Sequence, residues 1–231
     1  MLTALGRRLV VSEVASQIYF TAIVPLPILL VIAVACGVFS TVLSDVLMRP
    51  NGLAAHVPTV IAHATVRELV PIVIAVILIG RSGTAISTEL GYMRVNEEID
   101  ALDASGVNID YFLVLPRLLG LTVSAIAHTV ALSAAAILGG FFLGESLKLV
   151  SVGLRLSQIT TEIGPEVLAL ALGKAALFGI VIATVSCFRG LSVGRSFTDI
   201  PRANVRGAVQ CYLACFGLNA IISVYALTRV G

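Results

Sequence analysis

Four polar side chains interrupt the longest apolar stretches of this sequence: Arg67, Glu68, Lys174 and Asn219. If those stretches are membrane-spanning helices that rise about 1.5 Å per residue, Arg67, Lys174 and Asn219 each lie roughly 14–15 Å from one membrane surface. A charge at that depth costs at least about 2.5–3.5 kcal/mol, so such groups normally pair or face a cavity. We predict that the four residues form one intramembrane polar layer, with either a structural role or a role in gating or lipid movement.

The longest polar stretch, residues 81–110, is rich in acidic residues. Ile99 and Leu102 are three residues apart, so in a helix they share one face with the acids beside them. This pattern predicts an amphipathic acidic helix at the membrane surface, and it favours a docking role over a solvated loop. The residues expected to contact a partner are Glu89, Met93, Glu97, Glu98, Ile99, Asp100 and Leu102.

A nucleophile–base pair is the main catalytic alternative. Ser82 lies in a G-x-S-G pattern at 80–83, and His128 lies in a different apolar stretch. The two would make an intramembrane serine hydrolase if their side chains were within hydrogen-bonding reach. Counting residues along the third apolar stretch places His128 roughly 25 Å from the end at which Ser82 lies, so we expect no such dyad.

The motifs of nucleotide and metal sites are missing from the sequence. A phosphate-binding loop needs G-x-x-x-x-G-K-[ST] between a strand and a helix, whereas Gly173-Lys174 is followed by alanine inside an apolar stretch. The sequence contains no H-E-x-x-H motif and no Cys/His cluster. We expect no catalytic residue, metal or cofactor in this chain, and the net charge of +2 gives no indication of nucleic-acid binding.

The elements that carry these residues follow from the composition. The chain has 231 residues, of which 58% are hydrophobic and 12% charged, with a mean hydropathy of +1.04. A soluble domain has about 25% charged residues, and a spanning helix needs roughly 20 apolar residues. We therefore predict an all-α integral membrane protein with an interfacial amphipathic helix over 1–18 and one transmembrane domain over 19–231. Its five spans are expected at about 19–48, 57–80, 111–144, 166–188 and 207–228.

The distribution of Lys and Arg predicts the orientation of these spans. With five spans, one side carries nine of these residues in its loops and the other side carries four. Because cytoplasmic loops are enriched in Lys and Arg, the side with nine is expected to be cytoplasmic. The N-terminus is then cytoplasmic, and the C-terminus lies across the membrane.

The central block of the sequence resembles the MlaE-type permease family. The similarity rests on R-E-L-x-P at 67–71, GRSGTAISTELGYMRVNEEIDAL at 80–102 and PR at 116–117. It continues in GKAALFGIVIATVSCFRGL at 173–191 and IPRANVRGAV at 200–209, and it covers about Ser16 to Leu227. Members of this family are membrane subunits of ABC transporters that move phospholipids or related lipids together with MCE-domain proteins.

The resemblance implies a set of partners and a location. It implies a homodimer or pseudo-dimer of permeases, cytoplasmic ABC ATPases that bind the ATP, and an MCE-domain protein in the periplasm of a bacterium. It places the chain in the bacterial inner membrane with phospholipid as its cargo. The segment from about 85 to 110 would be the coupling helix that contacts the ATPase, and the four polar residues match polar intramembrane positions of the family.

The sequence also departs from the family pattern. The N-terminal helix is short, the loop GLSVGRSFTD is less rich in glycine, and Asn219 stands where the family often has Asp. With Asp the polar layer would be neutral; Asn219 leaves a formal charge of +1 unless Lys174 is deprotonated or a lipid phosphate or water-filled space compensates. A membrane scaffold without transport activity is a third interpretation, beside the permease and the hydrolase.

Overall fold

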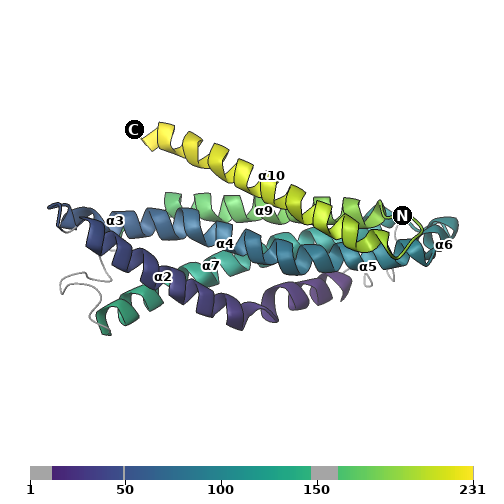
Figure 1. The fold of residues 1–231 in the computed structure, drawn as a ribbon, viewed down its shortest axis with the longest axis horizontal. Helices are drawn as coiled ribbons and strands as arrows, with labels where there is room; N and C mark the ends of the chain where they lie inside the picture. Colours follow the sequence, from purple (N-terminus) through teal and green to yellow (C-terminus); the bar gives the residue numbers. More distant parts are fainter. Residues whose placement is uncertain (1–11, 49, 147–160, 231) are drawn as a thin grey trace. The chain divides into compact units, whose positions relative to one another are not determined.

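The computed structural model describes residues 12–48, 50–146 and 161–230, and every regular element in these ranges is a helix (Figure 1). Five helical stretches are long and apolar enough to cross a membrane: Ser12–Met48, Val57–Val95, Asp110–Ser146, Pro165–Leu191 and Asp199–Ala226. The all-α prediction with five spans is therefore confirmed. Most of the interfacial helix predicted over 1–18 lies outside the described residues, and residues 12–18 are helical.

The first three spanning stretches combine α-helices with wider π-helical turns, and the last two are α-helical throughout. The α-helices are α2 (Leu26–Met48), α3 (Val57–Ile61), α4 (Val70–Leu78), α5 (Thr84–Val95), α6 (Glu98–Ala104), α7 (Leu115–Ser146), α9 (Pro165–Leu191) and α10 (Asp199–Val230). The π-helical segments are η1 (Tyr19–Ile23), η3 (Ala62–Leu69), η4 (Ile79–Gly83) and η5 (Asp110–Val114), and η2 (Ala54–His56) is a 3-10 turn. The π-helical conformation is often found at functional sites, and η3 and η4 carry several of the polar residues singled out above.

Prolines lie at several helix boundaries. Pro58 and Pro165 lie in the first two positions of α3 and α9, where the missing N–H leaves no hydrogen bond unmade. Pro25 lies between η1 and α2, where regular helix is interrupted. Pro116 lies at the change from the π-helical η5 to α7 inside one continuous helical stretch.

Two helices extend beyond the predicted spans. The second continues through η4 and α5 to Val95, and the fifth begins at Asp199, eight residues before the predicted start at 207. Leu90 on α5 packs against Gly190 of α9, where an added Cβ atom would lie 2.7 Å from the Leu90 Cβ. Close packing of this kind stabilises helix outside the apolar core of a membrane, where hydropathy no longer indicates it.

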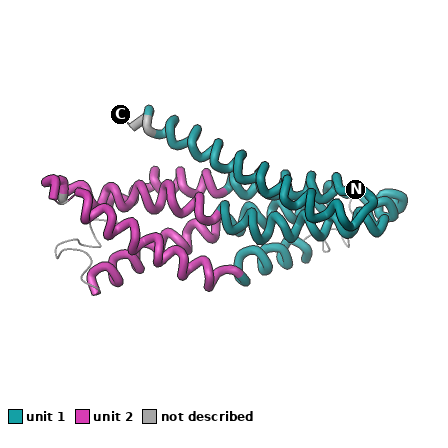
Figure 2. The backbone as a smooth tube through the Cα atoms, in the orientation of Figure 1, with its two compact units in different colours: residues 1–24, 75–125, 176–231 teal, residues 25–74, 126–175 magenta. Residues whose placement is uncertain are grey.

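The chain forms two compact units (Figure 2). Unit 1 contains residues 1–24, 75–125 and 176–231, and unit 2 contains residues 25–74 and 126–175. In unit 2, α2 and α7 approach so closely that a Cβ atom at Gly140 would lie 2.6 Å from the carbonyl oxygen of Gly37. Small residues allow this backbone approach, which is a common means of helix association in membranes.

Candidate functional site

Three of the four predicted polar residues meet in unit 2. Arg67 and Glu68 lie on η3, and Lys174 lies in α9. The Nζ atom of Lys174 lies 2.8 Å from Oε2 of Glu68 and donates a hydrogen bond of 3.2 Å to the carbonyl oxygen of Arg67. The other carboxylate oxygen of Glu68 lies 3.3 Å from Nε of Arg67. One acid is thus shared by two cations.

This cluster is buried on its cationic side. The side chain of Lys174 is 0% exposed and that of Arg67 is 6% exposed, whereas Glu68 is 31% exposed. Removing a charge from water is costly, and close oppositely charged neighbours recover much of that cost. The formal charge of the three side chains is +1, because two cations share one carboxylate.

The fourth predicted member of the layer belongs to the other unit. Asn219 lies on α10 in unit 1, whereas Arg67, Glu68 and Lys174 belong to unit 2. Its membership of the polar layer therefore stays a prediction.

The acidic segment predicted as one helix is divided into two. α5 ends at Val95 and α6 begins at Glu98, and Glu97 between them has a φ angle of 62° in the left-handed region. A residue other than glycine rarely adopts this conformation. Seven residues of α6 thus form a short separate helix, which changes direction from α5 at Glu97.

The predicted docking residues of this segment differ in exposure. Glu97, Glu98 and Asp100 are exposed, and Met93 and Leu102 are half-buried. Ile99 is only 3% exposed, so most of its side chain packs against this chain. This burial favours a role in holding α6 in place, and the contact of Ile99 with a partner stays a prediction.

Two of the predicted docking acids form ion pairs within the chain, and Glu98 accepts a longer hydrogen bond of 3.4 Å from the side-chain amide of Asn96. Glu89 accepts a hydrogen bond of 2.8 Å from the guanidinium of Arg117, which is 2% exposed and also donates to the carbonyl oxygen of Leu113. Asp100 lies 2.5 Å from the guanidinium of Arg94. Arg117 was not predicted as a partner of Glu89; its only signal in the sequence is its place in the P-R pair of the family motif. Glu97 and Glu98 are the exposed docking acids outside the Glu89–Arg117 and Asp100–Arg94 ion pairs.

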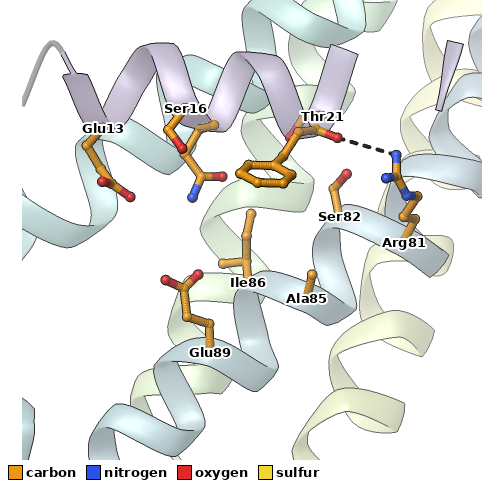
Figure 3. Close-up of a pocket in the computed structure, with 10 residues that line it drawn as sticks. Glu13, Ser16, Thr21, Arg81, Ser82, Ala85, Ile86 and Glu89 are labelled. Carbon is orange, nitrogen blue, oxygen red and sulfur yellow. Dashed lines mark hydrogen bonds between the residues drawn. The ribbon is translucent and has the colours of Figure 1, made fainter. Parts of the chain in front are cut away.

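A cavity of about 300 Å³ lies beside this segment in unit 1 (Figure 3). The N-terminal helix contributes Glu13, Ser16, Gln17, Phe20 and Thr21, and η4 and α5 contribute Arg81, Ser82, Ala85, Ile86 and Glu89. Arg81 donates a hydrogen bond of 3.3 Å to the carbonyl oxygen of Phe20 and so joins the two elements (Figure 3). The cavity thus connects the N-terminal helix with the start of the acidic segment.

The serine of the hydrolase alternative lines this cavity. Ser82 is 7% exposed and belongs to unit 1, whereas His128 is 1% exposed and belongs to unit 2. The described structure therefore gives no geometric support for a dyad of these two residues.

These features define a helical membrane protein with a buried charged cluster and an exposed acidic helix. The family model described as Permease MlaE matches residues 14–225, and the chain belongs to this permease family. It is similar to a probable ABC transporter permease protein of Rickettsia bellii, with 23% identity over 95% of this chain and 83% of the relative.

Two further relatives carry more specific names. The intermembrane phospholipid transport system permease protein MlaE of Haemophilus influenzae is 26% identical over 71% of this chain and 63% of its own length. The chloroplastic protein TRIGALACTOSYLDIACYLGLYCEROL 1 of Arabidopsis thaliana is 23% identical over 78% of this chain and 51% of its own length. The predicted family resemblance is confirmed by these matches.

Proposed function

We propose that this chain is the permease subunit of an ABC-type transporter that moves phospholipid or a related lipid across or out of a bacterial inner membrane. The family match over residues 14–225 carries this proposal. The similarity to a relative named as a phospholipid transport permease supports lipid as the cargo. The five apolar helices supply a scaffold for a path through the membrane.

The division of labour follows from the family. A cytoplasmic ABC ATPase binds and hydrolyses ATP, and this chain converts the resulting motion into movement of lipid. We propose that α6 and the turn before it form the docking surface for that ATPase. Glu97 and Glu98 face basic groups of the partner, and the half-buried Met93 and Leu102 provide apolar contact. Ile99 supports α6 from within.

Two further partners complete the proposed assembly. A second permease copy, identical or related, pairs with this chain, and an MCE-domain protein receives or delivers lipid on the periplasmic side. In this arrangement the N-terminus is cytoplasmic and the C-terminus is periplasmic, as the Lys and Arg distribution predicts.

Reconstitution tests the proposal directly. The chain is purified alone and in complex with its cognate ATPase, and each preparation is placed in vesicles with a fluorescent phospholipid. We expect no ATP turnover by the chain alone, and ATP-dependent lipid movement by the complex. ATPase without this chain is the control for background hydrolysis. ATP turnover by the isolated chain, or a complex that hydrolyses ATP without moving lipid, would contradict the proposal.

A further inference from the structure

A second cavity in unit 1 is lined by arginines. It has a volume of about 210 Å³ and lies where α9 ends and α10 begins. Arg189 comes from the last turn of α9, and Arg202 and Arg206 come from the start of α10. The one acid in its lining is Asp199, so three cations and one anion give a formal charge of +2. The electrostatics of this cavity therefore favour an anion.

The arginines are arranged so that their donors remain available. Arg202 and Arg206 are four residues apart, so they share one face of α10. The Arg202 guanidinium lies 3.7 Å from Asp199 and its side chain is 75% exposed, which makes this ion pair loose. Arg189 uses Nε to donate a hydrogen bond of 2.8 Å to Gln210, a contact that orients its guanidinium next to α10. The three guanidinium groups together have more N–H donors left than the Asp199 carboxylate can accept.

Phosphate is the anion that suits this arrangement. A guanidinium presents its donors in a planar fork that matches two oxygens of a phosphate group. One water occupies about 30 Å³ of liquid, so a cavity of 210 Å³ holds a phosphate group with a small alcohol attached. It is too small for the whole of a phospholipid, whose chains must lie outside.

An apolar face of α9 leads away from the cavity. Leu177, Ile180 and Phe188 are 43%, 40% and 63% exposed, and their spacing places them on one face of the helix. Phe188 directly precedes Arg189, and the Arg189 guanidinium lies 5.8 Å from the centre of the Phe188 ring. The apolar face thus ends at the wall of the cationic cavity. This pairing of a charged pocket with an apolar strip favours a lipid over a free phosphate ion.

We propose that this cavity binds the headgroup phosphate of an anionic phospholipid, with an acyl chain along the exposed face of α9. The lipid is a resident of the leaflet at this end of the helices and is separate from the cargo. Because basic pockets between helices on the cytoplasmic side bind anionic headgroups, the site agrees with the predicted orientation. It holds α9 and α10 together at their connecting loop, where Gly194 lies against Asp199.

Native mass spectrometry of the purified full chain in a neutral detergent tests this site. The chain is titrated with phosphatidylglycerol and, separately, with phosphatidylcholine. We expect preferential binding of phosphatidylglycerol, and Arg206→Gln should weaken it about tenfold because one charge-assisted contact is lost. Arg195→Gln is the matched control, since Arg195 is an exposed arginine of the same loop that does not line the cavity. Arg206→Lys should restore part of the affinity.

Three outcomes would overturn the proposal. The first is an equal loss in Arg195→Gln, which would indicate general attraction by positive charge. The second is binding of inorganic phosphate with the affinity of phosphatidylglycerol, which would make this a site for the free ion. The third is unchanged lipid binding in Arg206→Gln together with loss of ATPase association, which would make the cavity a protein contact. The lipid-binding measurements use this chain alone, and only the association assay needs the ATPase. Failure of the lipid site can therefore be distinguished from failure of the proposed transport function.

Discussion

At the scale of single residues, Glu68 holds the intramembrane cluster together. It contacts Lys174 and Arg67 with different carboxylate oxygens, and both cations are almost fully buried. The two cations repel each other, so the acid between them stabilises both. The cluster therefore depends more on its one anion than on either cation.

Substitution of the shared acid is the sharpest test of this cluster. Glu68→Ala removes a partner from a buried ion pair and is expected to cost about 3 kcal/mol of unfolding free energy. Lys174→Met keeps an apolar side chain of similar length and removes one cation, so we expect a smaller loss. Thermal unfolding of both variants in the same lipid nanodiscs makes the comparison. Greater stability of Glu68→Ala than of Lys174→Met would show that the shared-acid argument is wrong.

Counting residues from the predicted membrane surface was sufficient to group Arg67, Glu68 and Lys174, because helical rise is nearly constant. Residue counting could not reveal that Arg117 pairs with Glu89, because the two residues are 28 positions apart in the sequence. It also gave no sign that Ile99 points inward, since a helix face that meets a partner and one that meets its own chain are equally apolar.

At the scale of elements, the turn between α5 and α6 places two exposed acids, Glu97 and Glu98, next to each other. Glu89 on α5 and Asp100 on α6 instead form ion pairs with Arg117 and Arg94 of this chain. A left-handed residue with a side chain costs roughly 1–2 kcal/mol. We infer that Glu97 keeps α6 turned from α5 and also presents a charge to the partner.

Charge reversal at this turn should weaken the proposed ATPase contact. Exposed ion pairs contribute about 0–1 kcal/mol each, and reversal adds repulsion, so Glu97→Lys/Glu98→Lys should reduce ATPase association about tenfold. Glu145→Lys/Glu166→Lys is the control, because it changes the charge equally at exposed positions on the predicted opposite membrane surface. Association is measured by co-purification and ATP hydrolysis. An equal effect of the two double variants would argue against α6 as the docking element.

Close helix contact in unit 2 predicts a contrast between two glycines. Gly140→Ala would place a methyl group against the α2 backbone at Gly37, and overpacking of this kind typically costs 1–3 kcal/mol. Gly173 on α9 has open space around it, so Gly173→Ala should gain up to about 1 kcal/mol from the better helix propensity of alanine. Unfolding midpoints of the two variants distinguish these effects. Equal destabilisation by both would contradict the packing argument.

Hydropathy predicted the bounds of the third and fourth helices to within a few residues. It ended the second helix too early and began the fifth helix too late, so both were predicted shorter than they are. The reason is that hydropathy reports only the apolar environment. Leu90 and Gly190 extend the packing of α5 and α9 past it, which no hydropathy pattern shows.

At the scale of the whole molecule, the described arginines predicted to be cytoplasmic belong to one unit. They are the unit 1 residues Arg81, Arg94, Arg117, Arg189, Arg195, Arg202 and Arg206. Arg229, predicted on the opposite side, belongs to the same unit and lies in the last turn of α10. This concentration agrees with a single cytoplasmic side for the ends of the helices that carry them.

Reporter fusions test the resulting orientation. An alkaline phosphatase joined after Gly231 should be active, because that enzyme requires an oxidising compartment such as the periplasm. A green fluorescent protein at the same position should stay dark, because it does not become fluorescent when it is exported unfolded. Fusion to the loop at 194–196 should give the reverse pattern. Fluorescence from the C-terminal fusion with no phosphatase activity would contradict a periplasmic C-terminus.

The π-helical turn η4 makes the position of a deletion in this segment decisive. Its hydrogen bonds enclose one residue more than those of an α-helical turn, so the loss of one residue within η4 is absorbed by a return to regular α-helix. The residues that follow then keep their angular positions, and the contacts of Glu89 with Arg117 and of Gly91 with Val193 and Ile200 are kept. The loss of one residue from the regular helix α5 before Glu89 would instead rotate every later residue of that helix by about 100° about its axis.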